Sequence, residues 1–127
     1  MVAAVSDFTP KFPQSGKIKK SMIGESWNIE LKQTPDILAS LNKDGVTTIG
    51  FKAEMDPQSG LNSARLLLTQ KEVDAVCYNL LQDAGSFGTV DNEITFITTE
   101  KEVSLGRADK LTLSFKILEQ AEALVDE

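Results

Sequence analysis

Apolar residues along this chain change their spacing from segment to segment, between the period of two of a strand and the period near 3.6 of a helix. Glycine, proline, asparagine and aspartate separate these segments, as turn residues do. The strand-like segments are MVAAVS at 1–6, WNIELK at 27–32, VTTIGFKAE at 46–54, VDAVCY at 73–78 and EITFIT at 93–98. We therefore expect a protein with several short strands.

Helical spacing predicts three helices between and after these strands, over 34–42, 61–71 and about 108–125. In the first of them Thr34 is the predicted cap, Pro35 takes the first helical position, and Asp36 lies near the positive end of the helix dipole. Free backbone N–H groups at such a helix start form an anion site for a phosphate, although an ordinary capped helix is the alternative.

The alternation of strands and helices favours an α/β fold with a mostly parallel sheet, right-handed crossovers and flanking helices. Ligands of such sheets bind beyond the carboxyl ends of the strands. This rule points to Asp7, to 51–54, and to Asn79 with the loop that follows it. The 127 residues, 41 % of them apolar, predict one domain over 1–127. Because a buried strand opens the chain, we expect that domain to be part of a larger one.

Composition excludes several kinds of chemistry. The chain has no histidine, which excludes Ser/His/Asp triads, Cys/His dyads and histidine-based metal sites. Its one cysteine, Cys77, forms no internal disulfide, and no apolar stretch is long enough to cross a membrane. The sequence therefore predicts a cytoplasmic protein with no membrane partner.

The charge is unevenly distributed along the chain, whose formal net charge is −6. Four lysines and one aspartate give the first twenty residues a charge of +3, so the remaining residues carry −9. Lys17, Lys19 and Lys20 are close together in a loop that Pro10, Pro13 and Gly16 precede. A local basic loop attracts phosphate on an otherwise acidic protein, and a solvated lysine loop is the alternative. No aromatic cluster surrounds the lysines, so we expect no nucleic acid partner.

Six segments occur in the order and spacing of one enzyme family: AAVSDFTP, KIKK, TPDIL, IGFKAE, VDAVCYN and DNEITFIT. By these motifs the chain resembles the C-terminal half of the bacterial phosphopantothenate–cysteine ligases, which are often fused to a flavin-dependent decarboxylase. The resemblance implies a Rossmann-like α/β fold within a larger ligase domain. Flavin is implied only where a decarboxylase domain lies outside this chain.

The resemblance also implies a reaction of coenzyme A biosynthesis in two steps. CTP with Mg²⁺ activates 4′-phosphopantothenate as an acyl-cytidylate, and cysteine then displaces CMP. The chain would supply the nucleotide-binding and dimerisation half of a homodimer, and by itself it would be catalytically incomplete. The strand ITFIT near a sheet edge is the predicted pairing surface, and an ordinary internal strand is the alternative.

Residue by residue, the resemblance implies a nucleotide site, and it names no metal ligand in this chain. Lys17 begins the KIKK motif on a flexible flap over 8–26 that closes on the acyl-cytidylate, and it is the one residue with an implied catalytic role. Lys19 and Lys20 either strengthen the field at the phosphates or merely solvate the flap. The implied nucleotide contacts are Ala3, Asp7, Lys17, Pro35, Asp36, Ile37, Leu38, Phe51 and Lys71, with Asn79 as a further ligand contact.

Two departures from the family pattern accompany these matches. Leu67 stands where relatives carry a lysine four residues before the Lys71 position, and NLLQ follows where many have aspartate after the asparagine. The choice between CTP and ATP stays open, since relatives outside most bacteria use ATP. A non-catalytic nucleotide-binding or dimerisation module is the alternative function.

Overall fold

The computed structural model describes residues 6–82 and 88–126. The chain divides into two units, 1–40 and 41–127, which are described separately. The strand predicted over 1–6 falls almost wholly outside the described residues, and so does Ala3.

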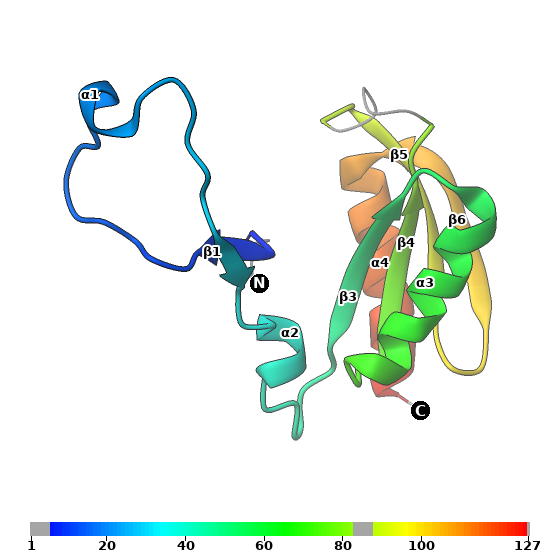
Figure 1. The fold of residues 1–127 in the computed structure, drawn as a ribbon. Helices are drawn as coiled ribbons and strands as arrows, with labels where there is room; N and C mark the ends of the chain where they lie inside the picture. Colours follow the sequence, from blue (N-terminus) through cyan, green and yellow to red (C-terminus); the bar gives the residue numbers. More distant parts are fainter. Residues whose placement is uncertain (1–5, 83–87, 127) are drawn as a thin grey trace. The chain divides into compact units, whose positions relative to one another are not determined.

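The second unit contains a four-stranded sheet in the order β3-β4-β5-β6 (Figure 1). Its strands are β3 (Ile49–Glu54), β4 (Ala75–Leu80), β5 (Asp91–Ile97) and β6 (Glu102–Asp109). The strands β3 and β4 are parallel and are joined through helix α3 (Pro57–Gln70), whereas β5 and β6 continue the sheet antiparallel. The α/β class with flanking helices is confirmed, and β5 and β6 make the described sheet mixed. The connection between them is too short for anything but an antiparallel hairpin.

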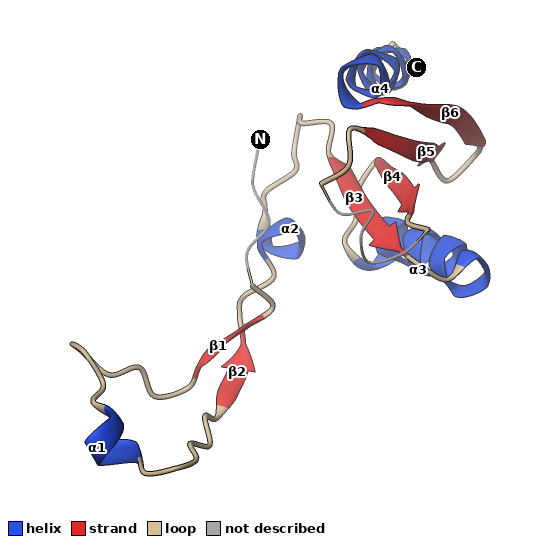
Figure 2. Ribbon diagram, turned by 90° about the horizontal axis from the view of Figure 1, so that it is seen from above, coloured by secondary structure: helices blue, strands red, loops and turns tan. Residues whose placement is uncertain are grey.

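Helix α3 and helix α4 (Lys110–Val125) cover opposite faces of this sheet (Figure 2). An aspartate caps each helix: Asp56 accepts from the Gln58 N–H, and Asp109 accepts from the Thr112 N–H at 2.9 Å. Hydrogen bonds from Ser59 and Gln58 lower the pKa of Asp56, and hydrogen bonds from Thr112 lower the pKa of Asp109. Pro57 at the first position of α3 starts that helix four residues before the predicted start.

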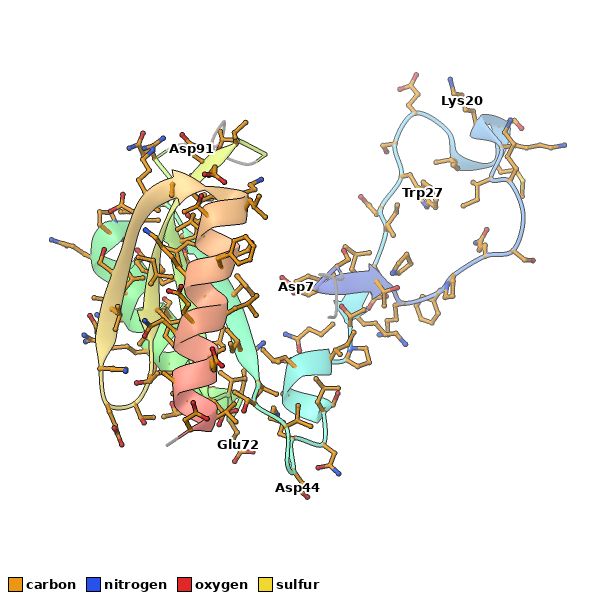
Figure 3. All side chains as sticks on the ribbon, turned by 180° about the vertical axis from the view of Figure 1, so that it is seen from behind. Asp7, Lys20, Trp27, Asp44, Glu72 and Asp91 are labelled. Atoms are coloured by element: carbon orange, nitrogen blue, oxygen red, sulfur yellow. The ribbon has the colours of Figure 1, made fainter. Side chains whose placement is uncertain are left out.

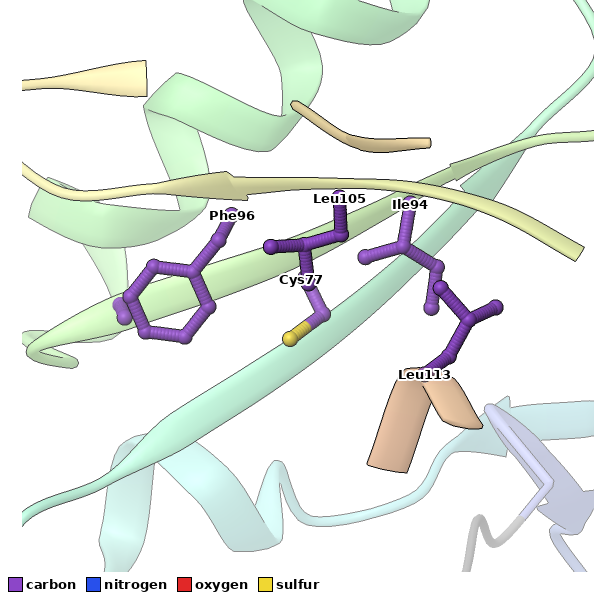
Figure 4. Close-up of a cluster of buried hydrophobic side chains, with 6 residues drawn as sticks. Cys77, Ile94, Phe96, Leu105 and Leu113 are labelled. Carbon is purple, nitrogen blue, oxygen red and sulfur yellow. The ribbon is translucent and has the colours of Figure 1, made fainter. Parts of the chain in front are cut away.

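The main core fills the space between the sheet and α4 (Figure 4). Alternate residues of the strands supply it, and the register places Cys77 beside Phe96. The buried members are Ala75, Cys77, Ile94, Phe96, Leu105 and Leu113. Residues of the opposite parity, among them Val76 and Ile97, are equally buried and point to the α3 side. The central strands are therefore buried on both faces.

Strand β6 is the one strand of the four-stranded sheet that the sequence did not predict. Its apolar alternation, seen at Val103 and Leu105, is interrupted at Gly106, whose φ is 73°. Gly106 pairs with β5 where the register shifts between Ile94 and Thr95. Because β6 pairs with the far side of β5, the ITFIT segment is an internal strand. Its prediction as an edge for dimer pairing was wrong, and the alternative of an ordinary sheet strand holds.

The first unit has little regular structure. Its elements are β1 (Phe8–Pro10), α1 (Lys20–Ile23), β2 (Leu31–Gln33) and α2 (Ile37–Ser40), and β1 pairs antiparallel with β2. Of the strand predicted over 27–32, only the last two residues belong to a strand, β2. The predicted cap was also wrong, because Asp36 caps α2 by accepting from the Ala39 N–H at 3.0 Å, while Thr34 bonds to the backbone of Ser6 and Asp7.

Helix α3 packs closely against β4, and this close approach requires a glycine at position 60 in the first turns of the helix. A Cβ at Gly60 would lie 2.6 Å from the Tyr78 hydroxyl and 2.9 Å from the Glu54 Cβ. We expect Gly60→Ala to lower the free energy of unfolding by about 1–3 kcal/mol, although alanine is the better helix former. Urea unfolding followed by circular dichroism measures this.

The matched variant is Tyr78→Phe, which removes a buried hydroxyl that has no hydrogen-bond partner. Alone it should leave stability unchanged or slightly raised, since an unpaired buried polar group is unfavourable. In Gly60→Ala it should restore part of the lost stability. Simple additivity of the two changes would contradict the close contact.

Candidate functional site

The lysines that the sequence singled out lie on a long loop, residues 11–30, which we call the lysine arm. At its base, Lys11 donates its backbone N–H to the Glu30 carbonyl at 2.9 Å and its Nζ to Glu30 Oε1 at 3.0 Å. Lys17 and Lys20 are both exposed on the arm, and Figure 3 shows Lys20 and Trp27 on it. The arm thus has a closed base and presents cationic side chains to solvent.

The other end of the β1–β2 pair brings two predicted segments together. Thr34 donates its N–H to the Asp7 carbonyl at 2.9 Å, and its hydroxyl donates to the Ser6 carbonyl. Asp7 is therefore adjacent to the Pro35–Leu38 segment, as a shared nucleotide site requires, whereas Lys17 lies on the arm beyond the opposite end of the pair.

The start of α2 differs from the anion site that its sequence predicts. The helix has only four residues, so its dipole is small. The Asp36 carboxylate already accepts the Ala39 N–H, and its negative charge faces any incoming phosphate. A nucleotide bound at this segment would therefore depend on backbone and hydroxyl contacts more than on the dipole of the helix.

In the second unit the structure separates two predicted contacts. Lys71 follows the end of α3 and precedes β4, whereas Asn79 lies at the carboxyl end of β4. A six-residue strand spans roughly 20 Å. Figure 3 shows the same separation, with Glu72 and Asp91 at opposite ends of the unit. The structure therefore does not bring Lys71 and Asn79 together.

Phe51 lies between these two ends, on the α4 side of β3. Its register partner on β4 is Cys77, which belongs to the core beneath α4. Helix α4 packs on β5 and β6 rather than on β3, and the Phe51 side chain is 67 % exposed. An exposed aromatic ring at this position is available to pack against a base or a ribose.

The carboxyl ends of β3 and β4 carry several polar groups. Asn79 Oδ1 is buried without a hydrogen-bond partner, beside a hollow of about 30 Å³ to which Arg107 of β6 also contributes. On the α3 side, Lys52 Nζ pairs with Glu54 Oε1 at 3.0 Å. Burial raises the pKa of Tyr78, and the carboxylates of Glu54 and Asp56 raise it further. Arg107 is not among the residues predicted from the sequence, because β6 was not predicted.

Larger hollows lie at the opposite end of this sheet. One of about 530 Å³ is open to solvent beside the ion pair of Arg65 with Glu102, and a second of about 280 Å³ is lined in part by Asp74 and Lys101. They lie at the amino ends of β3 and β4, away from the side where sheets of this class bind ligands.

Neither a cluster of metal-binding side chains nor a membrane-spanning helix occurs in the part of the chain that the structure describes. Among residues 6–82 and 88–126, no group of three or more cysteine, aspartate or glutamate side chains is placed to hold a metal ion. In the same residues no helix has the length and apolar character needed to span a bilayer.

Comparison with known proteins decides the family. Residues 1–124 match the model of the DNA/pantothenate metabolism flavoprotein C-terminal domain. The chain belongs to this family. Its flavoprotein-family relatives include the coenzyme A biosynthesis bifunctional protein CoaBC of Vibrio parahaemolyticus, 35 % identical over 127 residues, and that of Bacillus subtilis, 37 % identical over 126 residues. The matches cover 97 % and 96 % of this chain and 31 % and 30 % of the two proteins.

The relatives also include a human enzyme. Human phosphopantothenate–cysteine ligase is 32 % identical over 112 residues, which cover 84 % of this chain and 36 % of that protein. The chain therefore spans about a third of the length of the curated relatives it matches.

Solved structures agree with the family and with its α/β fold. The C-terminal domain of a CoaBC protein superposes with a TM-score of 0.68 at 26 % identity, covering 98 % of this chain and 53 % of that one. The flavoprotein from Streptococcus pneumoniae gives a TM-score of 0.69 at 22 % identity, covering 95 % and 57 %. The predicted recognition of the C-terminal half of the ligase is confirmed.

Burial makes the one thiol of this family member unreactive. Cys77 is fully buried in the core, and desolvation raises its pKa to about 12. We expect its reaction with a disulfide reagent at pH 8 to be more than about a hundredfold slower in the folded protein than in denaturant. Release of the coloured thiolate from the reagent measures the rate. A fast reaction under native conditions would contradict the buried placement.

Proposed function

We propose that this chain is the nucleotide-binding part of a phosphopantothenate–cysteine ligase that acts in coenzyme A biosynthesis. In the proposed reaction, CTP activates the carboxylate of 4′-phosphopantothenate as an acyl-cytidylate with release of pyrophosphate. The amine of cysteine then attacks the acyl carbon and CMP leaves, which gives 4′-phosphopantothenoylcysteine. The family match over residues 1–124 is the observation that carries this proposal.

The lysine arm supports a role for Lys17 in both steps. A cation on an exposed loop with a closed base is able to move toward a bound triphosphate while the base of the arm stays fixed. Charge develops on phosphate oxygens in each transition state, and a lysine there stabilises it. Closure of the flap over 8–26 would also exclude water from the activated acyl group.

The remaining contacts are assigned by their place in the fold. Asp7 and the Pro35–Leu38 segment are adjacent through Thr34, so we assign them jointly to the base and ribose of the nucleotide. Phe51 is assigned to the nucleotide as an exposed aromatic ring that is able to stack on a base or a ribose. Ala3, Lys71 and Asn79 complete the proposed contacts, with Lys71 the least supported because it lies at the other end of β4 from Asn79.

Mg²⁺ enters the proposal with the nucleotide. This ion keeps several waters and is usually bound through substrate phosphates and one or two carboxylates. The proposal therefore assigns it to the triphosphate and assigns no residue of this chain to it. Flavin belongs to the proposal only where a decarboxylase domain is fused to the ligase.

We further propose that the chain works as one α/β domain of a cytoplasmic homodimer. The alternative is a non-catalytic module that binds a nucleotide or dimerises without turning anything over. Binding of CTP without pyrophosphate release, once the chain is joined to the rest of a ligase domain, would favour that alternative.

Binding of CTP is the first expected outcome. In an NMR titration of the chain with CTP and Mg²⁺, we expect saturable shifts of the amides of Asp7, Lys17, Asp36 and Phe51. ATP serves as the control, and CTP should bind more tightly. Shifts confined to other residues would contradict the site, and tighter binding of ATP would contradict the choice of nucleotide.

Weaker binding of CTP after loss of the Lys17 charge is the second expected outcome. We expect Lys17→Gln to weaken CTP binding about tenfold, because a charge-assisted contact to a phosphate is lost. The matched control is Lys101→Gln, which removes an exposed lysine from the second unit. Isothermal titration calorimetry measures both, and equal affinity of the two variants would remove Lys17 from the site. Thermal unfolding of Lys17→Gln should be unchanged, since the side chain is exposed.

A further inference from the structure

The hollow at the carboxyl end of β4 lies between groups of opposite charge. Its volume is about 30 Å³, and its charged lining consists of Asp91 and Glu93 of β5 and Arg107 of β6. A volume of this size holds one small polar group, such as a water molecule or an ammonium group. We call it the Arg107 hollow.

Two of these charged residues are opposite each other on neighbouring strands. Glu93 and Arg107 are register partners, so their side chains lie on the same face of the sheet. This is the α3 side, because the adjacent residues Ile94 and Ala108 pack in the core beneath α4. Helix α3 packs mainly on β3 and β4, and both charged residues are exposed. Their side chains are therefore accessible to a small molecule.

The two opposite charges are not paired with each other. In the described part of the chain, no hydrogen bond or ion pair engages the side chain of Glu93 or Arg107. Gly106, with its φ of 73°, and the register shift on β5 lie directly beside this pair. Such irregularities bend a strand and re-aim the side chains next to them. The sheet thus presents a carboxylate and a guanidinium close together, each able to bind a ligand.

We propose that the Arg107 hollow binds the head group of an α-amino acid, with the ammonium at Glu93 and Asp91 and the carboxylate at Arg107. The two charged groups of an α-amino acid are one carbon apart, and neighbouring strands are about 4.8 Å apart, so both groups reach their partners at once. A guanidinium binds a carboxylate through two parallel hydrogen bonds. In the reaction proposed above the amino acid is cysteine, so the identity of the ligand rests on the proposed function, whereas the site does not.

The position and the charge of the hollow both suit this ligand. It lies at the carboxyl end of β4, which is the end at which sheets of this class bind ligands, and Asn79 also lines it. Its two carboxylates outnumber its one guanidinium, which favours an ammonium group inside it. The arginine at the opposite end of the sheet differs, because Arg65 is already paired with Glu102.

The experiment is an NMR titration of the 127-residue chain with reduced L-cysteine, with and without CTP and Mg²⁺. We expect saturable shifts of the amides of Leu80, Glu93 and Arg107 in the millimolar range, since few atoms make contact. Cysteamine lacks the carboxylate and mercaptopropionate lacks the amine. Each should bind at least tenfold more weakly than cysteine, because each loses one charge-assisted contact.

Substitution of the two partners tests the site itself. Arg107→Gln should weaken cysteine binding at least tenfold, and Glu93→Gln should weaken it as well. The matched control is Arg65→Gln, the same change at an exposed arginine beside the hollow at the other end of the sheet, which should leave cysteine binding unchanged. Because all three residues are exposed, the variants should keep the circular dichroism spectrum of the parent. None of them is a proposed nucleotide contact, so CTP affinity should stay the same.

Three results would overturn the proposal. The first is the absence of shifts at these amides both with and without the nucleotide. The second is equal weakening by Arg107→Gln and Arg65→Gln, which would show a nonspecific effect of lost charge. The third is undiminished binding of cysteamine or mercaptopropionate, which would show that one of the two charged groups is not bound.

Failure of the hollow and failure of the proposed function give different results. Binding of CTP together with any of these three results would leave the nucleotide site in place and remove the hollow. Binding of cysteine that depends on Arg107, in a chain that does not bind CTP, would support the hollow and contradict the proposed nucleotide site.

Discussion

Burial of β4 on both faces and along both edges is the constraint on which the second unit depends. Ala75, Val76 and Cys77 are fully buried, and successive side chains of the strand point alternately to α4 and to α3. Because β4 pairs with both β3 and β5, it joins the parallel β3–α3–β4 unit and the antiparallel hairpin of β5 and β6 into one sheet. It also excludes Cys77 from chemistry, since the same burial that packs the thiol keeps it protonated.

The first unit has a different physical character, which bears on its proposed role. Its described elements bury no residue, and Phe8, Phe12, Met22, Trp27, Ile29 and Leu31 are all exposed. Two three-residue strands and the Lys11–Glu30 contacts are the regular interactions that close its arm. A segment held by so few contacts changes conformation at low free-energy cost. That property suits the proposed flap, which would move between open and closed positions. A fully packed element would have to break many contacts to make such a movement.

The proposed activity places its phosphate chemistry on lysine and backbone groups in a chain without histidine. Acyl and nucleotidyl transfer do not require a histidine base when the main need is stabilisation of charge on phosphate oxygens. The carboxyl ends of β3 and β4 contribute polar atoms of another kind, among them the unpartnered Asn79 Oδ1. A buried acceptor of this kind gains a hydrogen bond when a ligand donor reaches it, because it has no protein donor to give up.

The sequence alone determined the family, the α/β class and the existence of β3, α3, β4, β5 and α4, because each of these elements carries an apolar period long enough to read. It did not determine β6, whose alternation breaks at the irregularity near Gly106, or the cap of α2, where Thr34 and Asp36 are both good caps. Only the tertiary structure decided that ITFIT is internal, that Asp7 meets the Pro35 segment, and that Lys71 and Asn79 lie at opposite ends of β4. The physical reason is that periodicity reports which residues avoid water, whereas strand order and the direction of a crossover depend on contacts between residues far apart in the chain.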